Sequence, residues 1–201
     1  MSFAGLSWRR LAFILLIAWG AYHHWQQRAE QHGPGVIAAD SPQQQSISHP
    51  SSFLLNNYTI TPLADFSLQA RVLSTQRYQL DRAAQLAPVD LALGWGRMSD
   101  ETVLSQISIS QSGRFYFWRV EQFPIPREEI QSHSANMHMV PADDTIAQQL
   151  KSIRVGQRVN IQGQLIEAKG ADGWTWRSSL TRTDTGNGAC ELVLVKSLAV
   201  E

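Results

Sequence analysis

A period of two in the apolar and polar residues dominates the body of this chain and predicts β-strands. The clearest case is QRVNIQGQLIEA, residues 157–168, where Val159, Ile161 and Leu165 share one face and polar side chains share the other. Further strands are predicted in FSLQARVLST, residues 66–75, and in ELVLVKSLAV, residues 191–200. The body is therefore expected to be rich in β-structure.

The segment SQISISQSGRFYFWRV, residues 105–120, predicts two strands joined by a turn. Ile107 and Ile109 alternate with polar residues, and Ser112 and Gly113 are a turn signal. The strand that follows, residues 114–120, is apolar on both faces. Strands of this kind lie inside sheets, so we expect residues 114–120 to form a central strand.

Helical patterns are few. The best runs from Asp144 to Ile153, with one apolar stripe and Gly156 as a stop signal. Shorter helical turns are predicted at residues 80–86 and after Ser99, and DLALGWGRMSDETVLSQ, residues 90–106, is interpreted as a helical insertion.

The order of strands, short helix, strand, turn and last strand resembles that of an OB-fold, in which a helix lies between the third and fourth strands. The predicted fold class is α+β and β-rich: an N-terminal transmembrane or signal-anchor helix, then a small, partly open, OB-like β-barrel with one main helix. No internal repeat is found.

The N-terminal segment SWRRLAFILLIAWGAYHHWQQRAE indicates export. Arg9 and Arg10 precede the uncharged run 11–22, and tryptophans and a tyrosine flank it as at membrane interfaces. We interpret residues 1–31 as an uncleaved signal anchor, single-pass in a bacterial inner membrane, with the C-terminal body in the periplasm. A cleaved signal peptide, with the triplet 18–20 as its cleavage site, and a cytosolic amphipathic anchor are the alternatives.

Composition divides the remainder into two parts. Residues 32–52 are rich in Gly, Pro, Gln and Ser and predict a flexible linker, and residues 53–201 form the β-rich extracytoplasmic domain.

The single cysteine, Cys190, leaves no internal disulfide. The 17 basic residues balance 17 acidic ones, which disfavours a nucleic-acid partner.

Several segments resemble a family of bacterial membrane-anchored proteins with no assigned activity. They are PVDLALGWGRMSD, QSGRFYFW, HSANMHMVPA, VGQRVNIQGQLIEA and WRSSLTRTDTGNGACELVLV, within residues 66–195. The resemblance implies an exported, bacterial setting and supplies no catalytic residue.

The stretch HSANMHMVP, residues 133–141, raises the question of a metal site. In an extended strand Asn136 and His138 share the polar face, whereas His133 points to the other side, so the two histidines do not chelate one metal. A structural role for His138 is the leading interpretation, and no metal or other cofactor is predicted.

Two patterns suggest catalysis without adequate support. Asp184-Thr-Gly matches an aspartic-protease signature, but no second loop of this kind is present. Cys190 with His133 or His138 and Asp184 gives the residue types of a hydrolase, but no spacing supports them. We assign no catalytic residue.

Aromatic and polar side chains form the remaining candidate binding surface. Trp174 and Trp176 lie two residues apart and either stack on a ligand or cap the core. The predicted binding residues are Trp95, Asn136, His138, Trp174, Trp176, Arg177 and Arg182.

The sequence thus favours a membrane-tethered periplasmic binding or scaffold module that acts through contacts with an envelope protein. A barrel that binds a small molecule or glycan is the alternative, and a hydrolase dependent on Cys190 and a histidine is the least favoured. The oligomeric state is not predicted.

Overall fold

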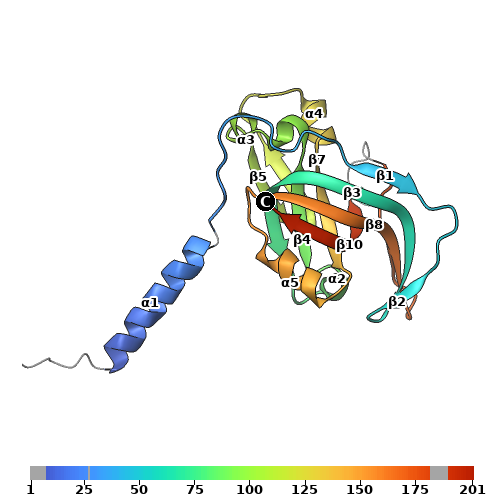
Figure 1. The fold of residues 1–201 in the computed structure, drawn as a ribbon, viewed down its shortest axis with the longest axis horizontal. Helices are drawn as coiled ribbons and strands as arrows, with labels where there is room; N and C mark the ends of the chain where they lie inside the picture. The colour runs from blue at the N-terminus through green and yellow to red at the C-terminus, as the bar shows by residue number, and fades with distance from the viewer. Residues whose placement is uncertain (1–7, 27, 182–189) are drawn as a thin grey trace, which may run out of the picture.

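The computed structural model describes residues 8–26, 28–181 and 190–201. Figure 1 shows one helix, α1, set apart from a body built mainly of strands. The strands are β1 (Gln43–Ser46), β2 (Phe53–Leu55), β3 (Tyr58–Arg77), β4 (Val89–Gly94), β5 (Ser108–Ser112), β6 (Phe115–Arg119), β7 (Ser134–Pro141), β8 (Arg158–Gly170), β9 (Thr175–Arg177) and β10 (Glu191–Val200). The helices are α1 (Trp8–Gln26), α2 (Arg82–Leu86), α3 (Glu101–Leu104), α4 (Arg127–Ser132) and α5 (Asp144–Ser152), with a 3₁₀ turn at Gly96–Ser99.

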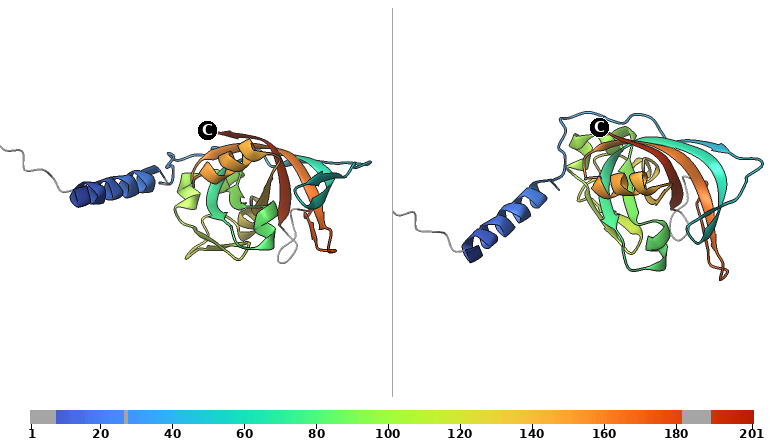
Figure 2. Two further views of the ribbon diagram at one scale, coloured as in Figure 1. Left: turned by 90° about the horizontal axis from the view of Figure 1, so that it is seen from below. Right: turned by 60° about the horizontal axis from the view of Figure 1, so that its bottom comes forward.

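One eight-stranded sheet forms the frame of the body. Its order is β1-β3-β4-β7-β10-β8-β9, with β2 also paired to β3. The long β3 pairs with β8 from Tyr58 to Arg71 and with β4 from Arg71 to Arg77, so the same strand borders both. The sheet therefore curves strongly around its inner face, as the two views in Figure 2 show.

The predicted small, partly open barrel was wrong, because the strands form one large sheet. β3 has 20 residues, and its register shifts at Pro62/Ala64 and Val72/Ser74 let it serve two neighbours. The short strands β1, β2 and β9 widen the sheet further. The mixed α+β, β-rich character of the prediction is confirmed.

Two strand assignments also change. Residues 90–94, interpreted as part of a helical insertion, belong to the fully buried strand β4 between β3 and β7. Residues 115–119, expected in the centre of the sheet, form β6 in a separate two-stranded hairpin with β5. Phe115 and Phe117 are 38% and 54% exposed there, so one apolar face of β6 points to solvent.

The predicted transmembrane or signal-anchor helix was also wrong. None of the helices in the described part of the chain is both long enough and apolar enough to cross a membrane. The helix α1 spans 19 residues, but its uncharged run from Leu11 to Tyr22 is shorter and ends at two histidines.

The segment between α1 and β2 contacts the body at several points. The Glu30 N–H donates to the Val155 carbonyl oxygen, the Gly96 N–H donates to the Ala38 oxygen, and Ala38 is fully buried. Residues 43–46 add β1 to the edge of β3.

Three apolar clusters hold the body together. The largest fills the inner face of the curved sheet, and α5 closes one end of it with Ile146 and Leu150. The helix predicted at 144–153 is thereby confirmed, and the Asp143 carboxylate caps it by accepting the Ile146 N–H at 2.9 Å. A second cluster lies on the outer face beneath Trp174 and Trp176, and a third lies beneath the β5–β6 hairpin.

Candidate functional site

A buried carboxylate lies on the outer face of the central strands. Asp90 on β4 is fully buried and stands directly opposite His138 on β7. His138 Nδ1 lies 2.9 Å from Asp90 Oδ1, but the geometry is not that of a hydrogen bond. The second oxygen, Oδ2, has no hydrogen-bond partner within the described chain.

Arg114 supplies the positive charge for this carboxylate from the turn of the β5–β6 hairpin. Its Nη1 donates to Asp90 Oδ1 at 3.0 Å and to the Ala87 carbonyl oxygen at 2.8 Å. Its Nη2 donates to Asp81 Oδ1 at 3.0 Å, and its guanidinium lies 3.8 Å from the centre of the Tyr78 ring. Four residues of the stretch 78–90 thus contact one side chain.

The backbone of the hairpin turn brings Arg114 to this position. Gly113 and Arg114 both have positive φ, 58° and 72°, as a two-residue hairpin turn requires. The Arg114 N–H donates to the Tyr78 hydroxyl at 3.1 Å, and its carbonyl oxygen accepts from Asn136 Nδ2 at 2.9 Å. Burial raises the pKa of Tyr78, and the negative charge of Asp90 raises it further.

Aromatic rings cover this buried cluster. The Trp176 ring lies 4.7 Å from the His138 ring, and Trp174 lies edge-on to Trp176 at 6.0 Å. Tyr58 and Arg82 also contact Trp174. Both tryptophans are half-buried and pack against the outer-face core. Asn136, His138, Trp174 and Trp176 of the predicted binding set therefore lie in one region.

The other predicted binding residues lie elsewhere. Trp95 is 2% exposed and belongs to the core on the inner face. Arg177 is exposed on β9, 3.5 Å from Glu167. Arg182 and Asp184 lie outside the described residues.

The two histidines of the HSANMHMVP stretch do not converge. The His133 ring lies 6.4 Å from Trp95, whereas His138 pairs with Asp90. Across residues 8–26, 28–181 and 190–201, no cluster of three or more His, Cys, Asp or Glu residues is arranged for a metal ion.

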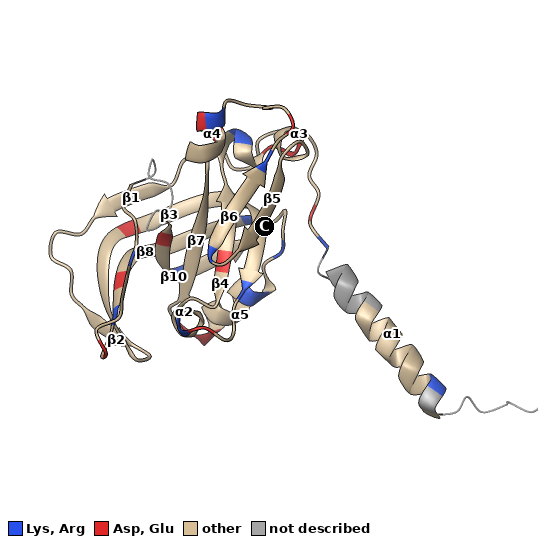
Figure 3. Ribbon diagram, turned by 180° about the vertical axis from the view of Figure 1, so that it is seen from behind, with Lys and Arg blue, Asp and Glu red and all other residues tan. Residues whose placement is uncertain are grey.

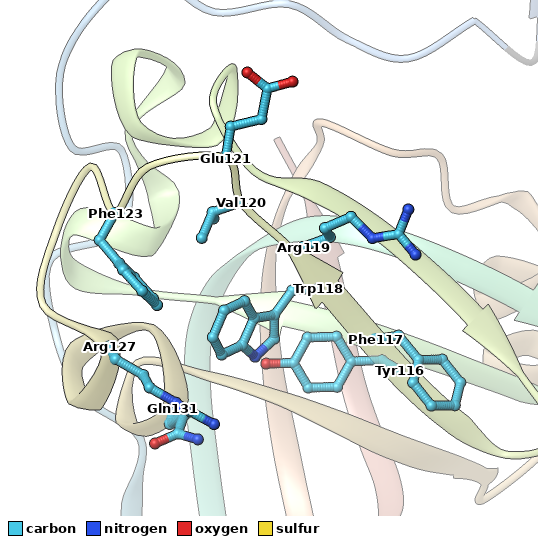
Figure 4. Close-up of a pocket in the computed structure, with 9 residues that line it drawn as sticks. All are labelled: Tyr116, Phe117, Trp118, Arg119, Val120, Glu121, Phe123, Arg127 and Gln131. Carbon is cyan, nitrogen blue, oxygen red and sulfur yellow. The ribbon is translucent and has the colours of Figure 1, made fainter.

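The β5–β6 hairpin presents a different kind of surface. Figure 4 shows an open hollow where Tyr116 and Trp118 of β6 face Phe123, Arg127 and Gln131. Its volume is about 550 Å³. Phe117 and Phe123 are each 54% exposed at its rim. We call this feature the aromatic hollow; its lining residues are Tyr116–Glu121, Phe123, Arg127 and Gln131.

Comparisons with protein-family models, with curated proteins and with solved structures find no match for this chain. The resemblance to membrane-anchored bacterial proteins stays a prediction. The geometry of the site therefore has to carry the functional argument.

The charges of the body do not form a field that would attract a partner over a long range. Figure 3 shows acidic and basic residues interspersed over the body, without an extended field of one sign. Locally, the aromatic hollow carries Arg119, Arg127 and Glu121, all exposed. None of the three takes part in an ion pair among the described residues, so their charges are available to a partner.

Sequence reasoning missed Asp90, Arg114 and the exposed ring of Phe123. Asp90 is an acidic residue inside the otherwise apolar run VDLALG, which is a usable signal for a buried, paired carboxylate. Arg114 follows a turn glycine, but its partners at residues 78–90 are distant in sequence.

Proposed function

We propose that this protein is a non-enzymatic binding module that recognises another protein through the β5–β6 hairpin. One observation carries the proposal: Phe117 and Phe123 are each 54% exposed in the lining of the aromatic hollow, and Phe115, on the same strand, is 38% exposed. Solvent-exposed aromatic groups clustered around a concavity mark interaction surfaces, because their burial against a partner supplies most of the binding energy.

The composition of this surface fits a protein partner. Tryptophan, tyrosine and arginine are the residues that contribute most to protein interfaces, and the hollow contains Trp118, Tyr116 and Arg127. The outer face of β5 adds small hydroxyl side chains, Ser108, Ser110 and Ser112, opposite Arg119, Phe117 and Phe115. An apolar centre with a polar margin is the usual anatomy of an interface.

The hairpin is also held rigidly, which lowers the entropic cost of binding. Arg114 fixes its turn, and Gln111 Nε2 donates to Asn136 Oδ1 at 2.7 Å. Tyr116 and Ser134 join their hydroxyls at 2.5 Å, and burial raises the pKa of Tyr116. The buried Asp90 cluster thus supports the presentation of the surface.

Site-specific photo-crosslinking in intact cells tests this function. A photoreactive amino acid at Phe117 is expected to give a discrete adduct with another protein. The same residue placed at Leu80, which is fully exposed on another surface, is the control and is expected to give none.

A second variant pair connects the adduct with the aromatic side chains. With the probe placed at Gln131, Phe117→Ser combined with Phe123→Ser is expected to remove the adduct, whereas Leu54→Ser, at another exposed apolar position, leaves it. If no adduct forms from Phe117 or Gln131, the hairpin is not a protein contact and the proposal fails.

A further inference from the structure

The strand β6 has one edge that no strand covers. β5 pairs with β6 along one side, and among the described residues no other strand pairs with either. The two-residue turn at 113–114 makes Ser112 and Phe115 a hydrogen-bonded pair, so Phe117 and Arg119 also bond to β5. The N–H and C=O groups of Tyr116 and Trp118 therefore point away from β5.

This free edge borders the aromatic hollow. The hollow is lined by consecutive residues of both faces of β6, from Tyr116 to Arg119, and on its other side by Arg127 and Gln131 of α4. No backbone hydrogen bond joins Tyr116 or Trp118 to any loop in the described parts of the chain. Unpaired strand edges accept an added strand readily, because the backbone groups of the edge are already aligned.

The side chains around the edge select the kind of strand. The rings of Trp118, Phe117 and Phe123 give apolar contacts to an incoming side chain. Among the residues that line the hollow, Arg119 and Arg127 outnumber Glu121, and neither arginine has a carboxylate partner among the described ion pairs. The neighbouring Glu129 is engaged by Arg97. Local charge complementarity thus favours an acidic residue beside the apolar anchor.

We infer that the partner contributes an extended, acidic and apolar segment that adds as a strand to the free edge of β6, with one apolar side chain in the aromatic hollow. This inference rests on the proposed function and specifies its mode. Backbone pairing to Tyr116 and Trp118 supplies orientation, the hollow supplies the apolar anchor, and Arg119 and Arg127 select a carboxylate.

A display library of random, linear seven-residue peptides is the probe. Peptides that bind the full wild-type chain are selected from it, and the same selection is run in parallel on two variants. One variant combines Arg119→Glu with Arg127→Glu, and the other, Lys196→Glu, changes an exposed charge on β10 as a control. Urea unfolding of each variant verifies that the fold is retained. Enriched peptides are expected to combine an aromatic or aliphatic residue with Asp or Glu. They are expected with the wild type and with Lys196→Glu, and not with the variant reversed at Arg119 and Arg127.

Backbone methylation of the best peptide then distinguishes strand addition from contact by side chains alone. Methylating the alternate amides along one edge of the peptide is expected to weaken binding at least tenfold, while methylating the other edge changes it less than twofold. Charge reversal at Arg119 and Arg127 is expected to weaken binding at least fivefold.

Three results would overturn the inference: no enriched peptide, equal binding of all methylated forms, or equal binding by the charge-reversed variant. The crosslinking experiment separates these results from failure of the proposed function. If the adduct at Phe117 forms while the peptides fail, the protein contact stands and strand addition is wrong. If the adduct is also absent, both proposals are wrong.

Discussion

Replacing Asp90 with asparagine removes one negative charge from the interior and keeps the shape of the side chain. Asp90 is fully buried, and its Oδ1 is shared between Arg114 Nη1 at 3.0 Å and His138 Nδ1 at 2.9 Å. In the variant, Arg114 keeps the half-exposed carboxylate of Asp81 and its contact with the Tyr78 ring. The hairpin turn therefore loses its main anchor but not all of its contacts.

The decrease in the free energy of unfolding depends on the partners that Arg114 keeps in the variant. Removing one member of a buried ion pair costs about 3–5 kcal/mol when the other charge is left alone. Because Arg114 keeps Asp81, we expect a loss of about 2 kcal/mol, which is the contribution of one charged hydrogen bond. For a chain of 201 residues this corresponds to a decrease in Tm of about 4–8 °C.

Urea unfolding at pH 7, followed by circular dichroism, measures this free energy. Arg114→Gln and the double variant complete a thermodynamic cycle, in which the coupling between Asp90 and Arg114 is expected to be about 1–2 kcal/mol. Asp40→Asn, at an exposed position, is the matched control and is expected to change stability by less than about 0.5 kcal/mol.

Amide hydrogen exchange locates the effect. The amides of β5 and β6 are expected to exchange faster in Asp90→Asn, while those of β3 and β8 change little. The reasoning would be refuted if the variant were as stable as the wild type within about 0.5 kcal/mol, or if the coupling with Arg114 were absent.

Two further predictions test packing and pH dependence. A Cβ on Gly163 would lie 1.9 Å from the Leu194 carbonyl oxygen, so Gly163→Ala should lose more than about 3 kcal/mol in urea unfolding, whereas Gly33→Ala, in open space, should match the wild type. A hydrogen bond from Arg71 holds the pKa of Glu101 below its ordinary value of 4.5, so it stabilises the fold above that pH and ceases to do so as pH falls through the lowered pKa. Glu101→Gln should therefore be less stable than the wild type at pH 7 and equal to it in strong acid, and a gap independent of pH would contradict this origin.

The local patterns of the sequence determined several elements correctly. The period-two pattern of residues 157–168 predicted β8, and the apolar stripe of residues 144–153 predicted α5. Such elements can be predicted from the sequence because their period is set by backbone geometry and by one buried face. The position of His138 on the polar face of its strand followed from the same alternation.

The tertiary structure alone decided which apolar segments became interior. Residues 89–94 and 115–119 are both short and apolar, yet β4 is buried between two strands and β6 exposes one face. Length and hydropathy do not separate these cases, because burial depends on which distant strand pairs with each segment. The pairing of Asp90 with His138 and Arg114 is likewise a product of long-range packing.

The free edge of β6 has the same origin. Sequence determines that residues 115–119 form a strand beside a turn, but a strand edge is free only if no other part of the fold covers it. Hydrophobic periodicity is a property of neighbouring residues along the chain. Whether a strand edge or a charged side chain is buried depends instead on residues tens of positions away. The sequence therefore specified the elements with a clear period, such as β8 and α5, and the packing of the sheet decided where the buried charge and the exposed aromatic hollow lie.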